Sequence, residues 1–295
     1  MAAGWTDLGD GIRVRQSRGY WLNSVLLLDP EVAWVVDPGL YPDELDELAA
    51  TLGRLQPEQV VLAFTHGDWD HVFGRWHWPH AWTVAHDRFA AFLRTHERGI
   101  RGEQRRLERE QHVSWPHPFQ PFRPDEAVSG QRFLKSGPWK LVLRDAPGHS
   151  DNMLTLHLPE QRMLLAADML SDIEMPSLHA PPADYRRTLE TLLPMAENGA
   201  LETLVPGHGA IARGRAAVME RFRADLGYLD ELERRVAVAR ADGLSAPETV
   251  ARLEDMTYTG KGDAAWDTTE FHRENVEHAY RAASAGRGTR REVPR

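Results

Sequence analysis

Short apolar runs along the chain predict two sets of β-strands. The runs are alternating or continuous in apolar residues, and Gly, Pro or Asp residues separate them, as is typical of strands joined by turns. The first set covers residues 11–15, 23–28, 33–36 and 60–64. The second set covers residues 132–135, 139–143, 153–158 and 162–167. The run at 60–64 is fully apolar and predicts a strand buried on both faces, and the two sets together predict a mixed or antiparallel sheet structure.

A different spacing, with apolar residues three and four positions apart, predicts helices. Leucines recur at this spacing in residues 43–55, which indicates a helix packed against the sheet. Residues 86–111 also have a helical composition and are rich in Arg. The stretch that follows, residues 114–124, holds so many prolines that we expect a surface loop there.

The last part of the chain is predicted to be helical. Apolar residues form a single stripe along one long helix, and they are Val218, Phe222, Leu226, Leu229, Leu232 and Val236. Further helices have start signals at Ser245, where Glu248 completes a capping box, and at Asp267. We therefore expect a C-terminal helical extension over residues 213–286, whose stripe packs on its own domain or on a second subunit to form a homodimer. A basic tail over residues 287–295 is predicted to be disordered.

The amino-acid composition says little about the fold but excludes several kinds of chemistry. The chain has 295 residues, of which 42% are hydrophobic, enough for one large domain and an appendage. It contains no cysteine, so disulfides, thiolate ligands and cysteine nucleophiles are excluded and any metal is held by nitrogen and oxygen. The formal net charge of −9 disfavours nucleic acid as a partner, because phosphates are bound mainly by Lys and Arg.

The sequence carries no targeting or membrane signal that we can identify. Its N-terminus lacks the basic start and the apolar segment of a signal peptide, and no stretch approaches the roughly 18 apolar residues that a membrane span requires. We therefore expect a cytoplasmic protein without a membrane partner.

The densest group of candidate metal ligands follows the apolar strand predicted at 60–64. These ligands are His66, Asp68, Asp70 and His71. Alternate residues of an extended chain point to the same side roughly 6.5 Å apart, so the first three can face one cavity while a turn brings His71 round. Imidazole and carboxylate are the ligands that zinc, manganese and iron accept where sulfur is absent.

Three further candidate ligands each come just after a predicted strand. They are His149 in a Pro-Gly-His sequence, Asp168, and His208 in a second Pro-Gly-His sequence. Strand ends at one edge of a sheet lie close together, and a Pro-Gly turn lets the imidazole project from the backbone toward a shared centre. The sequence therefore predicts one metal site built from separate segments of the chain.

In order, spacing and strand context, these residues resemble the metallo-β-lactamase superfamily, whose signature is His-x-His-x-Asp-His followed by a distant His, Asp and His. The resemblance covers residues 11–212 and includes the turn Asp37-Pro-Gly39 after an early strand. It implies an α/β (α+β) fold, a four-layer αββα sandwich that forms a catalytic domain over residues 1–212. The chain departs from the signature at Asp68, where the commonest form has His. Some branches, including phosphorylcholine esterases of the teichoic-acid type, are similar in having Asp as a ligand there.

The resemblance also implies a centre of two divalent metal ions. The ligands implied for the first ion are His66, Asp68 and His149. Those implied for the second ion are Asp70, His71 and His208, with Asp168 as a bridge. Carboxylates are needed here, because two cations about 3.5–4 Å apart repel each other strongly. Zinc is the expected metal, and Mn or Fe remain open because a carboxylate at Asp68 favours harder ions.

We hypothesise that the protein is a dinuclear metallohydrolase in which a hydroxide bridging the two metals attacks a carbonyl carbon or a phosphorus atom. Asp70 would be the catalytic residue that orients this nucleophile and helps pass a proton to the leaving group. The predicted substrate is a small ester, thioester, lactone or phosphodiester. Two residues after Asp168 are candidates for contact with it. These are His179, in a loop, and Tyr185, which alternatively packs in the core as part of a helix.

Two other functions remain open at the level of the sequence. One is a mononuclear iron oxygenase of the persulfide dioxygenase type, which a single iron per chain and oxygen consumption would favour. The other is a non-catalytic relic of the fold, which a protein without stoichiometric metal would favour. The RNA-cleaving branch of the superfamily is disfavoured, because the chain has no room for its inserted domain between Asp168 and His208.

Overall fold

The computed structural model of the chain describes residues 4–256, 258 and 269–285. The chain forms two compact units. The first unit comprises Met1–Ala146, Asn152–Ala167 and Thr203–Ile211. The second unit comprises Pro147–Asp151, Asp168–Glu202 and Ala212–Arg295. The helix start expected at Asp267 and the tail expected at 287–295 lie outside the described residues, and the boundary expected at residue 212 stays a prediction.

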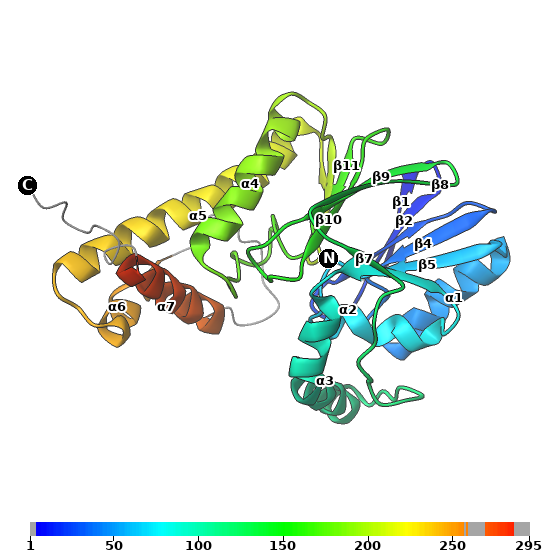
Figure 1. Ribbon diagram of the computed structural model, residues 1–295, viewed down its shortest axis with the longest axis horizontal. Helices are drawn as coiled ribbons and strands as arrows, with labels where there is room; N and C mark the ends of the chain where they lie inside the picture. The colour runs from blue at the N-terminus through cyan, green and yellow to red at the C-terminus, as the bar shows by residue number, and fades with distance from the viewer. Residues whose placement is uncertain (1–3, 257, 259–268, 286–295) are drawn as a thin grey trace, which may run out of the picture. The chain divides into compact units, whose positions relative to one another are not determined.

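The first unit contains a seven-stranded sheet whose strands follow one another in chain order (Figure 1). They are β1 (Gly4–Gly9), β2 (Ile12–Gln16), β3 (Asn23–Leu27), β4 (Val32–Val36), β5 (Gln59–Ala63), β6 (Trp82–His86) and β7 (Glu126–Val128). Pairing is antiparallel from β1 to β4 and parallel from β4 to β7. Parallel strands end at the same edge of a sheet, and Val36 lies opposite Ala63. The residues that follow β4 and β5 therefore emerge side by side.

A second sheet packs against this one within the first unit. Its strands there are β8 (Gln131–Ser136), β9 (Trp139–Asp145), β10 (Leu154–Leu158), β11 (Met163–Leu165) and β12 (Thr203–Val205), in the order β12-β11-β10-β9-β8. One apolar core joins the sheets and includes Val14 and Trp34 from the first, and Leu143 and Leu156 from the second. Burial of each such side chain stabilises the fold by about 1.5–3 kcal/mol. The α/β fold with two sheets that the sequence predicts is confirmed.

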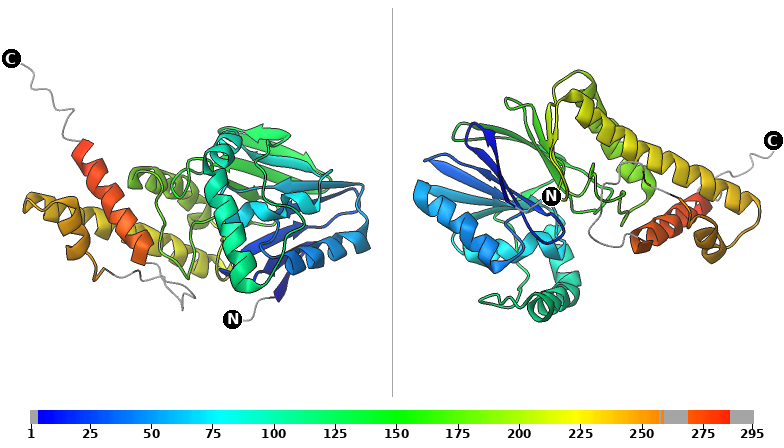
Figure 2. Two further views of the ribbon diagram at one scale, coloured as in Figure 1. Left: turned by 90° about the horizontal axis from the view of Figure 1, so that it is seen from below. Right: turned by 180° about the vertical axis from the view of Figure 1, so that it is seen from behind.

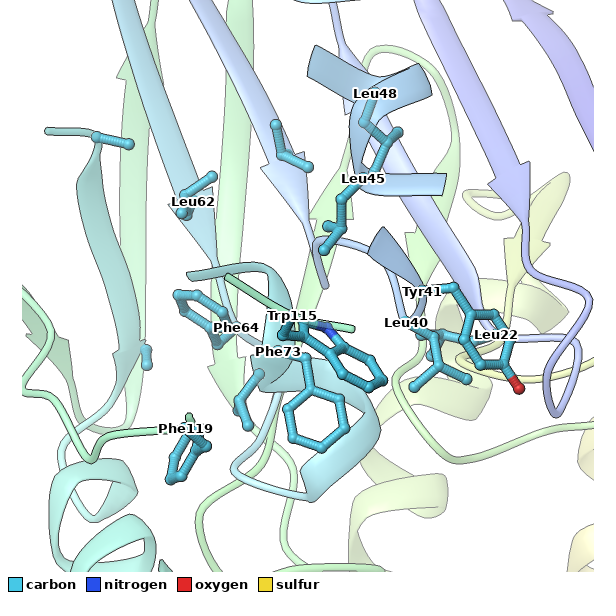
Figure 3. Packing of buried hydrophobic residues seen from close by; sticks show 14 of the residues in the cluster. Leu22, Leu40, Tyr41, Leu45, Leu48, Leu62, Phe64, Phe73, Trp115 and Phe119 are labelled. Atoms are coloured by element: carbon cyan, nitrogen blue, oxygen red, sulfur yellow. The ribbon is translucent and has the colours of Figure 1, made fainter. Parts of the chain in front are cut away.

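Helices α1 (Pro42–Leu55) and α3 (Phe89–Gln111) cover the outer face of the first sheet (Figures 1 and 2). Leu45 and Leu48 of α1 belong to the same buried cluster as Leu62 of β5 and Phe64 just after it (Figure 3). The leucine spacing that predicts a helix over residues 43–55 thus places these side chains on its buried face. The proline-dense stretch after α3 is a loop with no regular element before β7, as predicted.

Two short helices lie between β5 and β6. They are α2 (Trp69–Val72) and the 3₁₀-helix η1 (Phe73–His77). A side chain at Gly74 could not be accommodated, because its Cβ atom would lie 2.0 Å from the carbonyl oxygen of Pro38. This close approach holds the segment after β5 against the turn that follows β4.

The second unit is mainly helical and contains α4 (Pro182–Glu197), α5 (Arg215–Ala241), α6 (Ala246–Arg252), α7 (Thr269–Ala285) and the short strand β13 (Ala212–Arg213). The long α5 packs against α4, α6 and α7. It buries the predicted stripe except Leu226, which is half-buried. The capping box predicted at Ser245 is also confirmed, since the side chain of Glu248 accepts from the Ser245 backbone N–H at 2.8 Å.

The ranges predicted from the sequence leave out five strands, β1, β6, β7, β12 and β13, and they misplace one helix start. Strands β1, β6 and β7 carry no clear apolar run, because β1 alternates half-buried and exposed residues and β7 has three residues only. The helix predicted from residue 86 begins at Phe89, because His86 still belongs to β6. Within the described parts of the chain, no helix combines the length and the apolar character that crossing a bilayer requires.

Candidate metal centre

The ligands predicted in the first unit lie at one edge of its sheets. They are His66 and Asp68 in the turn after β5, Asp70 and His71 in the first turn of α2, and His208 after β12. The turn that carries His208 is held beside β3, because the backbone N–H of Asn23 donates to the carbonyl of Gly207 at 2.7 Å. Segments far apart in the sequence thus meet where β3, β5 and β12 begin or end.

Three of these side chains form a compact group. The Oδ2 atom of Asp70 lies 3.1 Å from Nε2 of His208 and 3.7 Å from Nε2 of His71. Each of the three residues offers one ligand atom within 4.8 Å of the other two, and all three are buried. A single cation between two imidazole nitrogens and a carboxylate oxygen would fit this spacing.

His66 and Asp68 form a second group beside the first. Nε2 of His66 lies 3.5 Å from Oδ2 of Asp68, and the rings of His66 and His71 lie 4.1 Å apart between centroids. His66 is fully buried, whereas Asp68 is partly exposed. Asp68, where the commonest signature has histidine, thus has an oxygen beside the His66 ring, and its role as a ligand stays a prediction.

Asp37 orients two of the histidines and was not singled out as a functional residue from the sequence. Its Oδ1 atom accepts from the backbone N–H of Thr65 at 2.8 Å, and its Oδ2 atom accepts from the Thr65 hydroxyl at 2.7 Å. The Thr65 hydroxyl, its own proton given to Asp37, can then accept from Nδ1 of His66 at 3.0 Å. Oδ2 of Asp37 also lies 3.0 Å from Nδ1 of His71. The bond with Thr65 places the proton of His66 at Nδ1 and its lone pair at Nε2. The Asp37 carboxylate beside Nδ1 of His71 favours the same tautomer there.

His208 has the same tautomer for a different reason. Its Nδ1 atom lies 2.7 Å from the backbone carbonyl of Tyr20, which can only accept, so Nδ1 donates and Nε2 carries the lone pair. The three candidate ligand histidines of the first unit are thus arranged to direct a lone pair from Nε2, and two carboxylates stand within 4 Å of those nitrogens. This donor set of nitrogen and oxygen fits a divalent ion such as zinc.

The second unit holds the two remaining predicted ligands. Nε2 of His149 lies 3.6 Å from Oδ2 of Asp168, and both side chains are less than one tenth exposed. Nδ1 of His149 donates to the carbonyl of Ser177 at 3.1 Å, which again leaves the lone pair at Nε2. His149 thus shares the tautomer of the histidines in the first unit.

The Pro-Gly turn before His149 is required by close packing. Gly148 has a φ of +154°, and a Cβ atom there would lie 2.6 Å from Cα of Tyr185. A larger residue would push the turn away from α4 and would move His149 with it. The sequence predicts a turn here that lets the imidazole project, and the close approach of Tyr185 adds a packing reason for the glycine.

The two predicted substrate contacts differ in the structure. His179 is exposed, its ring lies 5.1 Å from that of His149, and its backbone N–H donates to the His149 carbonyl at 3.1 Å. Tyr185 is fully buried, and its hydroxyl donates to Asp225 at 2.8 Å. Tyr185 therefore has the core role that the sequence left as its alternative, and it lines no surface that a substrate can reach.

Other residues beside the ligands could not be identified from the sequence. Asn152 accepts from the backbone N–H of Gly67 at 2.8 Å and so fixes the turn that carries His66. Tyr20 packs edge-on against Trp69 at 5.3 Å, and Arg106 of α3 donates to the Tyr20 hydroxyl at 2.9 Å. Tyr20 also has a positive φ of 54°, a strained conformation that is common at functional sites. Of these residues, only Asp37 stands in a recognisable sequence motif, the Asp-Pro-Gly turn after β4.

The chain matches the family model of the metallo-beta-lactamase superfamily over residues 22–208. Among curated proteins, it is 25% identical over 221 residues to the acyl-coenzyme A thioesterase MBLAC2 of Gallus gallus, a match that covers 68% of this chain and 78% of the relative. It is also 25% identical over 229 residues to the protein of the same name from Homo sapiens, covering 68% and 79%.

Solved structures show the same fold at low identity. A beta-lactamase domain protein from Burkholderia ambifaria has a TM-score of 0.69 at 18% identity, covering 96% of this chain and 88% of that one. A metallo-beta-lactamase family protein from Thermus thermophilus has a TM-score of 0.64 at 20% identity, covering 95% of both chains. The sec-alkylsulfatase Pisa1 from Pseudomonas sp. has a TM-score of 0.68 at 13% identity, and the match spans 52% of that longer chain.

Proposed function

The chain belongs to the metallo-beta-lactamase superfamily, and on this premise we propose that it is a metal-dependent hydrolase that cleaves the thioester bond of an acyl-coenzyme A. The observation that carries the metal-dependent part is the compact group of Asp70, His71 and His208, with both imidazoles presenting Nε2. The thioester is proposed because the curated relatives are named acyl-coenzyme A thioesterases.

The proposed cofactor is a pair of divalent ions, zinc first, in the arrangement that the superfamily signature implies. The first ion is assigned to His66, Asp68 and His149. The second ion is assigned to Asp70, His71 and His208, and Asp168 is assigned as the bridge. When bound, such ions lower the pKa of a water molecule toward neutrality and polarise the carbonyl oxygen of the substrate.

The protein groups then have separate tasks in the proposed reaction. Asp70, whose side chain is nine-tenths buried, accepts a hydrogen bond from the attacking water and so directs its oxygen at the thioester carbon. The bond between the carbonyl carbon and sulfur breaks, and the sulfur leaves with the electron pair. The proton from the water passes by way of Asp70 to the thiolate. The products are a carboxylic acid and a thiol, and no oxidant or reductant is consumed.

Substrate binding is assigned to the exposed groups beside the ligands. His179 is exposed next to His149, and its ring can donate to an oxygen of the acyl or thiol portion of a substrate. Tyr20 and Trp69 are half-buried aromatic residues next to His208 and Asp70, and they offer an apolar surface to an acyl chain.

The test is a thiol-release assay on the purified protein with acyl-coenzyme A substrates of several chain lengths. The chain has no cysteine, so a thiol reagent titrates the released coenzyme A without background from the enzyme. We expect hydrolysis that is lost after chelation and restored by Zn²⁺ or Mn²⁺, without oxygen consumption. Hydrolysis of a lactone or phosphodiester panel with no activity on thioesters would overturn the substrate. One iron per chain with oxygen uptake would overturn the reaction class.

A further inference from the structure

The helices of the second unit bind the backbone that joins Asp168 to His179, which we call the 170–178 segment. At its first end, Asp225 of α5 accepts from the backbone N–H of Leu170 at 3.0 Å. Asp225 also accepts from the hydroxyl of Tyr258 at 2.5 Å, and that hydroxyl reaches the Ser171 carbonyl at 3.1 Å. The start of the segment is thereby fixed to α5 through buried hydrogen bonds.

Asn275 of α7 holds the other end of the same segment. Its Oδ1 atom accepts from the backbone N–H of Leu178 at 2.9 Å, and its Nδ2 atom donates to the carbonyl of Pro176. The second Nδ2 proton goes to the Tyr228 hydroxyl at 2.8 Å. Asn275 is fully buried, and these partners fix the orientation of its amide, because a carbonyl only accepts and a backbone N–H only donates.

The amide of Asn275 is itself held by an ordered chain of hydrogen bonds. The Tyr228 hydroxyl, which accepts from Asn275, donates to Nδ1 of His272 at 2.9 Å. Nε2 of His272 then donates to the Leu253 carbonyl at 2.9 Å. Burial lowers the pKa of His272, which agrees with the neutral ring that this chain of bonds requires. The hydrogen-bonded chain that holds the 170–178 segment therefore joins α5, α7 and the end of α6.

The residue between the two backbone groups that Asn275 binds is Ser177, and its carbonyl accepts from Nδ1 of His149. We propose that Asn275 is a positioning residue: it fixes the Ser177 carbonyl, and thereby the tautomer and direction of the His149 ring. The C-terminal helices thus set the geometry of a candidate metal ligand by way of the Ser177 carbonyl. The assignment of His149 as a ligand rests on the proposed function, whereas the hydrogen-bonded chain from Asn275 to its ring does not.

The test compares Asn275→Ala with Tyr280→Phe in the full chain. Tyr280 lies on the same helix and donates to the Leu244 carbonyl at 2.9 Å, so Tyr280→Phe removes a hydrogen bond of α7 without removing one to the 170–178 segment, whereas Asn275→Ala removes the bonds to Leu178, Pro176 and Tyr228. We expect Asn275→Ala to weaken Zn²⁺ affinity, measured by competition with a chelator, by roughly 10–100-fold. The Zn²⁺ affinity of Tyr280→Phe should stay within about twofold of wild type. A larger loss in Asn275→Ala then cannot be explained by the loss of a helix contact alone.

The wild type and the Asn275→Ala variant are also compared without metal. In ¹⁵N NMR spectra of the metal-free protein, His149 should be protonated at Nδ1 in the wild type and should exchange between tautomers in Asn275→Ala, with faster hydrogen exchange at the Leu178 amide. Should Asn275→Ala fail to fold, Asn275→Ser is the second variant: it is neutral, its short hydroxyl cannot bond to both Pro176 and Leu178, and we expect a similar loss. A variant with wild-type Zn²⁺ affinity and an unchanged His149 tautomer would overturn the inference. A wild-type protein without Zn²⁺ affinity would overturn the proposed function, and the NMR arm would still decide the role of Asn275.

Discussion

The two units of the molecule orient their candidate metal ligands in different ways. In the first unit, His66 and His71 are oriented by Asp37 and Thr65, which follow two neighbouring parallel strands. In the second unit, His149 is oriented by a loop carbonyl, and a helix much further along the chain fixes that loop. One set of ligands is thus supported by the edge of a sheet and the other by packed helices.

The two kinds of support should respond differently to mutation. A sheet edge orients ligands through strand register, so its support is rigid and lies close to the ligand motif. A helical support is joined to its ligand by side-chain hydrogen bonds, and each of these can be removed singly. Substitutions in the two units should therefore have distinct signatures.

The largest effect is expected at Asp70, the candidate ligand for which we also propose a catalytic role. Asp70→Asn should leave the fold and most of the bound metal in place, because an amide oxygen still fits beside His208. The neutral side chain cannot take the proton, so we expect kcat for thioester hydrolysis to fall by roughly 10²–10⁴-fold. Steady-state kinetics and metal analysis on one preparation measure both quantities. Turnover near that of wild type would reject the role of Asp70.

The next largest effect concerns the buried carboxyl group that supports the second unit. Burial raises the pKa of Asp225 to about 6 from an ordinary value of 3.8, so folding favours the protonated form. Its contribution to stability is therefore fully present below pH 3.8 and is lost as the pH rises through about 6, a change of up to about 3 kcal/mol. Urea unfolding of wild type and Asp225→Asn across this range should show a stability difference that changes with pH. Parallel pH profiles would contradict the assignment.

A smaller effect is expected from the support in the first unit, and the chain offers a matched control. Asp37→Asn places an amide donor against the Thr65 hydroxyl, so we expect Zn²⁺ affinity to fall by roughly 10–100-fold. Asp125 makes the same pair of bonds to the backbone N–H and the hydroxyl of Thr83. Asp125 is exposed, so Asp125→Asn should cost less stability than Asp37→Asn and leave Zn²⁺ affinity within about twofold. Equal losses of affinity in both variants would show that Asp37 acts through stability alone.

The smallest effect is expected at the start of α6 in the second unit. Ser245→Ala removes the capping box at the start of α6 and should lower the free energy of unfolding by about 1 kcal/mol. Zn²⁺ affinity and kcat should not change, because in the part of the chain that the structure describes the side-chain bonds at Ser245 join it to Glu248 and Thr249 of α6, away from the groups that hold the 170–178 segment. Chemical denaturation and chelator competition measure the two quantities. A loss of Zn²⁺ affinity here would mean that any weakening of the helices disturbs the ligands.

The sequence predicts the fold where apolar spacing is strong. The leucines of α1 and the apolar run of β5 have clear periods, and both elements lie within one residue of their predicted limits. The strands β1 and β6 escape prediction because tertiary pairing makes them strands, not their own apolar content. The order of strands in a sheet likewise depends on long-range pairing that no local pattern encodes.

The candidate site divides in the same way. The predicted ligands stand in short motifs with Gly and Pro at fixed positions, so their residue types and spacing carry the signal. The groups that orient them do not. Asn275 has no motif around it, and Tyr20 acts on His208 through a backbone carbonyl, which every residue has. The sequence therefore predicts which residue types could bind a metal, whereas the orientation of their side chains depends on the folded chain.

The central claim is that the ligand histidines present Nε2, and not Nδ1, to a metal beside Asp70. A crystal structure with anomalous data collected at the zinc edge tests it most directly. We predict an anomalous peak at about 2.0–2.1 Å from Nε2 of His71 and His208, with Nδ1 of each ring bonded to Asp37 or to the Tyr20 carbonyl. Coordination through Nδ1, or a zinc-soaked crystal without a peak at this group, would contradict the account.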